Sequence, residues 1–469
     1  MTLSLILLIA GLLATPSRYT SVDVEINWNG SEKETAVCYR AIAGDDGRFL
    51  RVTRNFDPEY MEIEVLNSTY GFPGHPRSVP EWAVDTLTGS EGWPRAVVIA
   101  FPGLRPGMTI EWTFRVRERG HLAESGLFYT YIADNEPDTI TISCPDVDNL
   151  SVGSTGFTET TGRNRRYFSS LDKDYREIWL STAADWGEVR DILLESSDLS
   201  AMETPPDLRE AAIEAGAAGA LPRMRVSRGR ILITESMQLL PFPGGDAGFA
   251  VRSLQEILDS RRATPIEAAT LLSAMCRVMS IEAPVIPATN IIPLVPSPIG
   301  FFRAFIFVDG ELEEPSEYLS PAGWVDTPDT LHLLLPGGTL AEMPPPEESE
   351  RCMETWDISP SSGVFSLSIQ TQGGFDRELR RKLAGMDTYE ALLNISDWFR
   401  SSGIYFYPES IQLSDLFDLT EPAWIIVDGI IPPTGDNWIE TAPSLNWNRE
   451  GIITRDYVNV EYGNNVISR

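Results

Sequence analysis

The change of hydrophobic period near residue 180 is the feature that most constrains the fold of this chain. Before it, apolar residues alternate with polar ones, for example in residues 22–28 and 109–116. A period of two is typical of β-strands that bury one face and expose the other. Turns rich in glycine and proline, such as residues 101–107, separate these segments. The pattern predicts an antiparallel β-sandwich over residues 18–180.

Beyond that point the apolar residues recur at helical spacing, which predicts a second region of mixed α and β structure. The expected helices span residues 187–199, 206–218, 249–261 and 264–279, and strand-like runs span 283–295 and 301–308. A segment rich in proline and glutamate near residues 344–348 has the composition of a linker. We therefore expect an α+β core over residues 181–345.

The remaining residues, 346–469, predict a mixed, β-rich region with two helices. Residues 364–369 alternate as a strand, and residues 375–383 and 388–400 have helical spacing. Aromatic, strand-like runs continue from there to the end of the sequence. The fold class predicted for the whole chain is therefore mixed and multidomain.

Charge excludes one class of partner. The sequence of 469 residues carries 68 Asp and Glu against 37 Lys and Arg, a formal net charge of −31. A surface of this sign repels the phosphate backbone of nucleic acids and anionic lipid headgroups. We therefore expect no nucleic-acid partner.

Residues 1–17 have the features of a signal peptide. Residues 3–14 form an apolar run interrupted only by Ser4 and Gly11. A membrane span needs about 20 residues, whereas a signal-peptide core is shorter. No lysine or arginine precedes the run, so a buried first strand or helix is the alternative interpretation. Because no later segment approaches spanning length, we expect an exported protein without a membrane span. It would lie in the periplasm, on the outer envelope or outside the cell.

The four cysteines are too few and too scattered for a disulfide scaffold or a zinc site. Cys38 and Cys144 both fall in the β-rich region, and an oxidising compartment would permit a bond between them. The other interpretation treats them as small buried apolar residues. Both interpretations remain open at the level of sequence.

One helix start is unusually well defined. Thr264 suits the N-cap, Pro265 the first helical position, and Glu267 completes a Thr-x-x-Glu capping box. An apolar stripe at helical spacing follows, formed by Leu271, Leu272, Met275 and Met279. These residues predict a buried helix that begins at Pro265.

This helix resembles the core helix of a known family of bacterial envelope proteins. The family joins an N-terminal β-sandwich of unknown function to a transglutaminase-like core, and its helix carries the pattern A-x-L-L-x-A-L-L-R-x-x-G-I-x-A. The matching residues here are Ala269, Leu271, Leu272, Ala274, Arg277, Ile281 and Ala283. The segments 240–244 and 101–114 resemble the family's lead-in and its sandwich turn. The resemblance covers most of residues 20–345.

The resemblance implies a papain-like triad of Cys, His and Asp, and it aligns those positions with Pro265, Arg303 and Asp326 of this chain. Proline offers no nucleophile, and arginine does not release its proton to act as a general base. The third position is kept, within Trp324-Val325-Asp326-Thr327-Pro328. With two of three positions replaced, we expect no catalytic residue here. We also expect an ion pair between Arg303 and Asp326.

Other chemistries have little support in the sequence. Cys276 lies about three turns into the helix and is expected to be a core residue. His75 and His121 fall in the sandwich, and His332 is expected in a strand or loop. The sequence has no phosphate-binding loop, no H-E-x-x-H and no G-x-S-x-G, so we expect no cofactor and no metal. The acidic segments 311–314 and 415–418 are expected to be solvated surface.

Three functional hypotheses follow. The first is an exported, catalytically inactive transglutaminase-like protein that binds an envelope protein, a peptide or a glycan, or acts as a scaffold. The second is an active thiol enzyme, of transglutaminase or peptidase type, that uses Cys276. The third is glycan or peptide binding by aromatic residues of the last region, namely Trp398, Tyr405, Tyr407, Trp424, Trp438 and Trp447.

Overall fold

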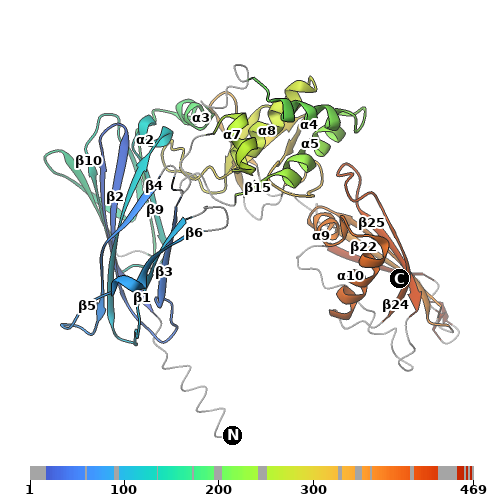
Figure 1. Cartoon of the computed structure of the whole chain (residues 1–469), viewed down its shortest axis with the longest axis horizontal. Helices are drawn as coiled ribbons and strands as arrows, with labels where there is room; N and C mark the ends of the chain where they lie inside the picture. The colour runs from blue at the N-terminus through green and yellow to red at the C-terminus, as the bar shows by residue number, and fades with distance from the viewer. Residues whose placement is uncertain are drawn as a thin grey trace, which may run out of the picture.

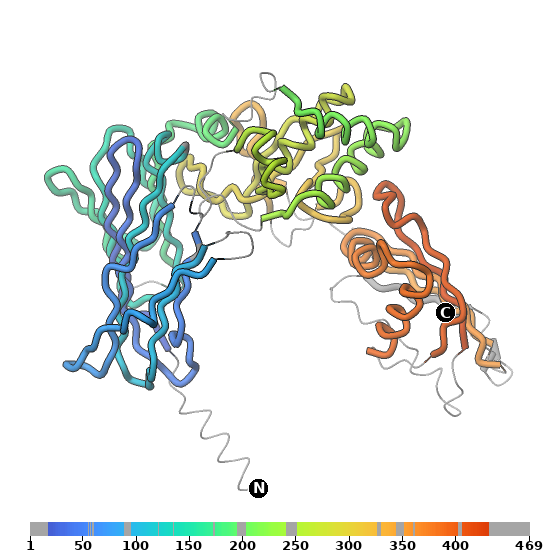
Figure 2. The backbone as a smooth tube through the Cα atoms, in the orientation of Figure 1, coloured from blue at the N-terminus to red at the C-terminus, as the bar shows by residue number. Residues whose placement is uncertain are grey.

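The protein is a β-rich chain of several sheets with helices between and beside them, shown in Figures 1 and 2. The computed structural model describes residues 17–430 except for 57, 59–60, 89–94, 135, 172–173, 195–202, 241–250, 326–329, 344–350, 360–361 and 402–405. Beyond residue 430 it describes the backbone of 452–458, 461–462 and 465–466. Apart from Ser17, the expected signal peptide lies outside the described residues, as does the expected linker.

The N-terminal sandwich, residues 17–181, is built on one eight-stranded sheet. Its strands, in spatial order, are β12 (Phe157–Thr161), β13 (Arg165–Ser170), β10 (Thr139–Pro145), β1 (Arg18–Trp28), β2 (Glu32–Ile42), β8 (Thr109–Arg119), β4 (Met61–Gly71) and β5 (Arg77–Ser78). Two three-stranded sheets cover it: β11 (Ser151–Thr155), β14 (Tyr175–Ser181) and β9 (Phe128–Asp134), and β3 (Arg51–Phe56), β7 (Arg95–Ala100) and β6 (Val84–Thr88). The short helices η1 (Glu81–Ala83) and α2 (His121–Ser125) join strands.

The alternation seen in the sequence decides which residues form the core of this sandwich. On β1, Val22, Val24 and Ile26 are buried, while the residues between them are half-buried or exposed. They pack with Ile178 and Leu180 of the covering sheet in one apolar cluster. The alternation therefore predicted the buried and exposed faces of β1.

The expectation of a purely antiparallel sandwich is wrong at one position. Strand β1 pairs with β2 in the antiparallel sense but with β10 in the parallel sense. The chain passes through β9 in the covering sheet immediately before it enters β10, so β10 does not arrive from a hairpin beside β1. Periodicity alone does not reveal such a crossover.

The Cys38–Cys144 pair is not formed, because β1 lies between the two strands. Asp23 of β1 is opposite Cys38 on one side and opposite Thr141 on the other. Two interstrand steps amount to about 10 Å, whereas the Cα atoms of a disulfide lie about 4–7 Å apart. The four cysteines are all free thiols.

The middle part, residues 186–343, consists of helices packed on an antiparallel sheet. The helices are α3 (Trp186–Leu194), α4 (Pro206–Gly216), α5 (Pro222–Ser236), α7 (Leu254–Ser260) and α8 (Pro265–Val278). The sheet has the order β19 (Glu311–Glu313), β18 (Arg303–Val308), β17 (Val285–Thr289), β20 (Leu331–Leu334) and β21 (Leu340–Met343). A small parallel pair joins β15 (Gln238–Leu239) to β16 (Arg262–Ala263).

Helix α5 is missing from the sequence-based prediction. Its buried face includes Ser227, Gly229 and Arg230, which do not register as an apolar stripe. Gly229 lets α5 approach α8 closely, because a Cβ there would lie 3.0 Å from Leu272 Cδ1. Helix α7 also begins later than expected, where Ser253 caps it.

The C-terminal part, residues 351–430 with β26, is a mixed sheet with two helices on it. The strand order is β24 (Tyr407–Leu413), β25 (Trp424–Ile430), β23 (Val364–Gln372), β22 (Arg351–Ile358) and β26 (Ile452–Val458). A hairpin of β27 (Glu461–Tyr462) and β28 (Asn465–Val466) follows. The helices α9 (Gly374–Leu383) and α10 (Thr388–Ser401) were both predicted, and their apolar faces share one core with the sheet. In the part of the chain that is described, no helix has the length and apolar character needed to cross a bilayer.

Candidate functional site

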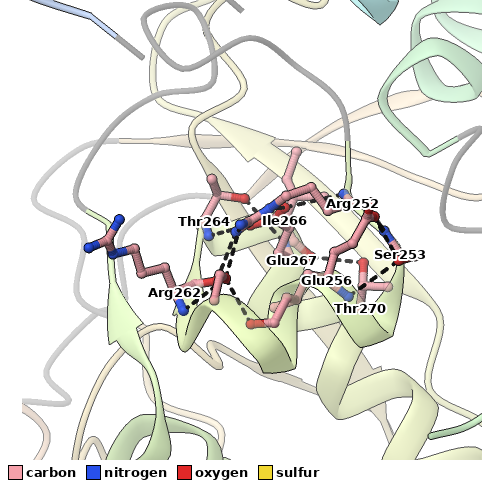
Figure 3. Close-up of polar contacts among 10 residues, drawn as sticks. Arg252, Ser253, Glu256, Arg262, Thr264, Ile266, Glu267 and Thr270 are labelled. Atoms are coloured by element: carbon pink, nitrogen blue, oxygen red, sulfur yellow. Dashed lines mark hydrogen bonds and ion pairs between the residues drawn. The ribbon is translucent and has the colours of Figure 1, made fainter. Parts of the chain in front are cut away.

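The α8 start is formed as the sequence predicts. Thr264 is the N-cap and Pro265 the first helical residue. The Thr264 N–H donates to Glu267 Oε2 at 2.9 Å, and the Glu267 N–H donates to Thr264 Oγ1 at 3.3 Å (Figure 3). The capping box therefore occupies the position where the resemblance would place a cysteine thiolate.

Arg252 makes a second set of contacts with Glu267 at this helix start. Glu267 is 1% exposed and receives Arg252 Nε on Oε1 at 2.8 Å and Arg252 Nη2 on Oε2 at 2.9 Å. The Arg252 guanidinium also donates to Ser260 Oγ and to the Arg262 carbonyl, while the guanidinium of Arg262 points away from the helix start (Figure 3). The Glu267 carboxylate is thus held by a bidentate pair and by the backbone N–H groups of Arg252 and Thr264, which fixes the helix start.

At the second aligned position, Arg303 begins β18 and pairs with Glu314. Arg303 Nε donates to Glu314 Oε1 at 2.8 Å, and Nη2 donates to Oε2. The guanidinium carbon lies 5.2 Å from the centre of the Phe305 ring. Asp326 lies outside the described residues, so the predicted Arg303–Asp326 pair stays a prediction.

The side chain of Arg303 and the helix α8 lie on opposite faces of the sheet at β18. Ala304, Ile306 and Val308 belong to the apolar cluster that contains α8, as predicted for a strand that packs against this helix. Phe305 belongs to a different cluster, and Arg303 lies on the side of Phe305. The fold therefore brings the helix and the strand together, but the Arg303 side chain lies on the sheet face away from α8.

The expectation that residues 311–314 are solvated is wrong for two of them. Glu313 and Glu314 are 2% and 3% exposed. Glu313 accepts Arg230 Nη1 at 2.9 Å and the Gly323 N–H at 3.0 Å, and burial raises the pKa of both carboxyls. Buried carboxylates need such partners, and the partner residues are far away in the sequence.

Cys276 is a core residue, as expected. Its side chain is fully buried in the cluster around α8. Burial, with a smaller contribution from the charge of Glu313, raises the pKa of the thiol to about 12. At neutral pH it is therefore a thiol without access to substrate, and a thiolate is the form that attacks carbonyl carbons.

The other residues singled out in the sequence are dispersed. His332 is 4% exposed on β20, opposite Thr289 and Glu342, whereas His75 lies exposed in a turn of the sandwich. Of the C-terminal aromatics, Trp398 is 6% exposed, Trp424 is half-buried and Tyr407 is 69% exposed. Tyr405, Trp438 and Trp447 lie outside the described residues. His121 begins α2. Within the described ranges, no cluster of His, Cys, Asp and Glu is arranged to hold a metal ion.

Two hollows lined by described residues are candidates for a binding site. One, of about 800 Å³, lies between the starts of α4 and α7 and is lined by residues such as Thr204, Arg209 and Leu254. The other, of about 530 Å³, lies between the middle and C-terminal parts, next to Trp324 and Val325. No sequence pattern indicates the second hollow, because its walls come from segments that are distant in the chain.

Comparisons with known proteins give a similar fold without an activity. No protein-family model and no curated protein matches this sequence. A structure from Parabacteroides distasonis, described as a "putative protease", aligns with 89% of this chain and 94% of its own, with a TM-score of 0.59 and 12% identity. An M1 zinc metallopeptidase from Deinococcus radiodurans (TM-score 0.22, 12% identity, 35% of this chain and 42% of that chain) is much less similar. Native yeast LTA4 hydrolase is also much less similar, with a TM-score of 0.23 and 12% identity over 36% of this chain and 30% of that chain. The first structure therefore shares the overall arrangement of this chain, and the other two carry no weight.

Proposed function

We propose that the protein is an exported, catalytically silent transglutaminase-like protein that serves as a binding or scaffold module in the cell envelope. The main support is the start of α8. There Pro265 stands at the aligned nucleophile position, and the Arg252–Glu267 pair fills the space beside it. A fold persists without its chemistry because activity depends on a few residues of the site.

The physical argument concerns the thiolate. In a papain-like mechanism the partial positive charge of a helix N-terminus and a nearby imidazolium lower the pKa of the nucleophilic thiol. Here Pro265 has neither a thiol nor a backbone N–H. The position aligned with the imidazole holds Arg303, whose side chain lies on the sheet face away from α8 and pairs with Glu314. The aligned positions therefore supply neither a thiol at the helix start nor an imidazolium beside it.

Protease activity is the competing hypothesis, since the similar structure from Parabacteroides distasonis is described as a "putative protease". A thiol protease built on Cys276 would need a buried thiol to ionise, against a pKa of about 12. Glycan binding by the C-terminal aromatics has weaker support, because Trp398 is buried and Trp424 is half-buried.

The test measures thiol-dependent chemistry on the folded protein. We expect no incorporation of a fluorescent amine into a glutamine-containing protein, no cleavage of a peptide pool detected by mass spectrometry, and no labelling of Cys276 by iodoacetamide before unfolding. Cys276→Ser should behave as the native protein does, with Cys352→Ser, also buried, as the matched control.

Turnover that falls at least a hundredfold in a still-folded Cys276→Ser variant, and not in Cys352→Ser, would overturn the proposal. The export part is tested separately. Deleting residues 1–17 should retain the protein in the cytoplasm of an expressing bacterium, and unchanged export of the shortened chain would refute it.

A further inference from the structure

The hollow between the middle and C-terminal parts has rigid walls. The Ala322 N–H donates to the Leu419 carbonyl at 2.9 Å, which joins the two parts directly. Arg377 and Arg381 of α9 both donate to Glu317, at 2.7 and 2.9 Å. The segment 314–323 is thus attached to the C-terminal part at two positions: Glu317 is bound to α9, and Ala322 is bound to Leu419.

Its far wall, the loop 416–423, is held from within the C-terminal part. Arg380 donates to the carbonyls of Leu416 at 2.8 Å, Asp418 at 2.9 Å and Glu421 at 2.5 Å. Asp376 pairs with Arg380 and accepts the Ala423 N–H at 2.6 Å. Because Asp376 and Arg380 neutralise each other, neither one supplies net charge to the hollow.

The remaining charge at the hollow is negative. Glu421 lines it with an exposed side chain, and none of the described residues pairs with this carboxylate. Glu311 stands at the rim, because a Cβ on the lining residue Gly323 would lie 2.8 Å from Glu311 Oε2. No lysine or arginine is among the described lining residues, and the nearby Arg377 is engaged by Glu317 and lies over the Trp324 ring.

The rest of the lining is largely apolar. It includes Trp324, Val325, Met343, Leu419 and Pro422. A volume of about 530 Å³ lies within the range of small-ligand sites, which are mostly apolar with a few polar groups and often lie between domains. Such a site suits an apolar group that carries a positive charge.

We propose that this hollow binds a short peptide segment in which an arginine or lysine lies beside an apolar residue. The inference rests on the proposed binding function and names its ligand. The apolar side chain would pack against Trp324 and Met343, and the cationic group would reach Glu421 and Glu311. Electrostatic complementarity then selects against acidic segments.

The test uses three fluorescein-labelled tripeptides with blocked ends: Leu-Arg-Leu, Leu-Gln-Leu and Leu-Glu-Leu. Fluorescence anisotropy should show binding that falls in that order. Glu421→Gln, and more strongly Glu421→Gln with Glu311→Gln, should weaken binding of the arginine peptide about two- to fivefold per charge. Glu409→Gln, an exposed carboxylate on β24, is the matched control and should change nothing.

Equal binding of the acidic peptide, or an arginine peptide indifferent to both glutamate variants, would refute the inference. All three variants are surface changes from glutamate to glutamine, so loss of folding does not confuse the result. Mass spectrometry of the same mixtures separates the two proposals. Cleavage of the peptide would refute catalytic silence and leave the site standing, whereas absence of both binding and cleavage would refute only the site.

Discussion

The Glu267→Ala variant tests whether the buried contacts of Glu267 at the start of α8 stabilise the folded protein. The change removes the carboxylate half of the capping box, which costs about 1 kcal/mol of unfolding free energy. It also leaves Arg252, which is 19% exposed, without its bidentate partner. Removing one partner of a buried pair costs about 3–5 kcal/mol, and the lower end applies because Arg252 keeps some contact with water. We therefore expect a total loss of about 4 kcal/mol.

Glu256→Ala provides a matched control within the same chain. Glu256 forms the same capping box with Ser253 at the start of α7, but on the exposed surface. Its loss should cost only about 1 kcal/mol. Hydrogen exchange of the α8 and α7 amides, with urea unfolding followed by circular dichroism, would measure both changes. A Glu267→Ala cost no larger than that of Glu256→Ala would show that burial and Arg252 contribute nothing, and would refute the reasoning.

Three further predictions concern other contacts. In urea unfolding, the stability losses of Arg303→Ala and Glu314→Ala should differ in sum from the loss of the double variant by at least about 1 kcal/mol. A double variant whose loss equals that sum would mean that the two side chains are not coupled. Burial raises the pKa of Glu314 in the folded state, so above about pH 4.5 the unfolded chain releases this proton more readily than the folded protein does. The free energy of unfolding of the native protein should therefore fall relative to that of Glu314→Gln as the pH rises above about 4.5, and the opposite slope would contradict this. Gly153→Ala should loosen the contact between β11 and the middle part and so increase the rate of limited proteolysis, because its Cβ would lie 2.4 Å from Leu294 Cβ. Gly337→Ala, whose Cβ would meet no atom within 4 Å, should leave that rate unchanged, and equal rates for the two variants would count against the prediction.

Much of the local structure followed from the sequence. Thr264, Pro265 and Glu267 fixed the start of α8, since capping depends on neighbouring residues only. Alternation placed Val22 and Val24 in the core of the sandwich because strand side chains have a strict period of two. The helices α9 and α10 were found for the same local reason.

Contacts between distant residues had to come from the tertiary structure. The structure places Glu314, the residue after β19, beside Arg303, whereas the sequence indicated only that residues 311–314 are acidic surface. The predicted Arg303–Asp326 pair stays a prediction, because Asp326 lies outside the described residues. The pairing of Arg252 with Glu267 likewise depends on how the residues before α7 lie against α8. No periodic signal marks such ionic partners.

The sequence by itself determined the buried face of β1, the helices α8, α9 and α10, and the absence of a cysteine at the start of α8, because these depend on local pattern and residue identity. The tertiary structure decided which charges are buried, which face of β18 carries Arg303, and where a ligand-sized hollow lies. It does so because burial and pairing are set by the packing of segments that are far apart in the chain, such as 321–325 and 419–422.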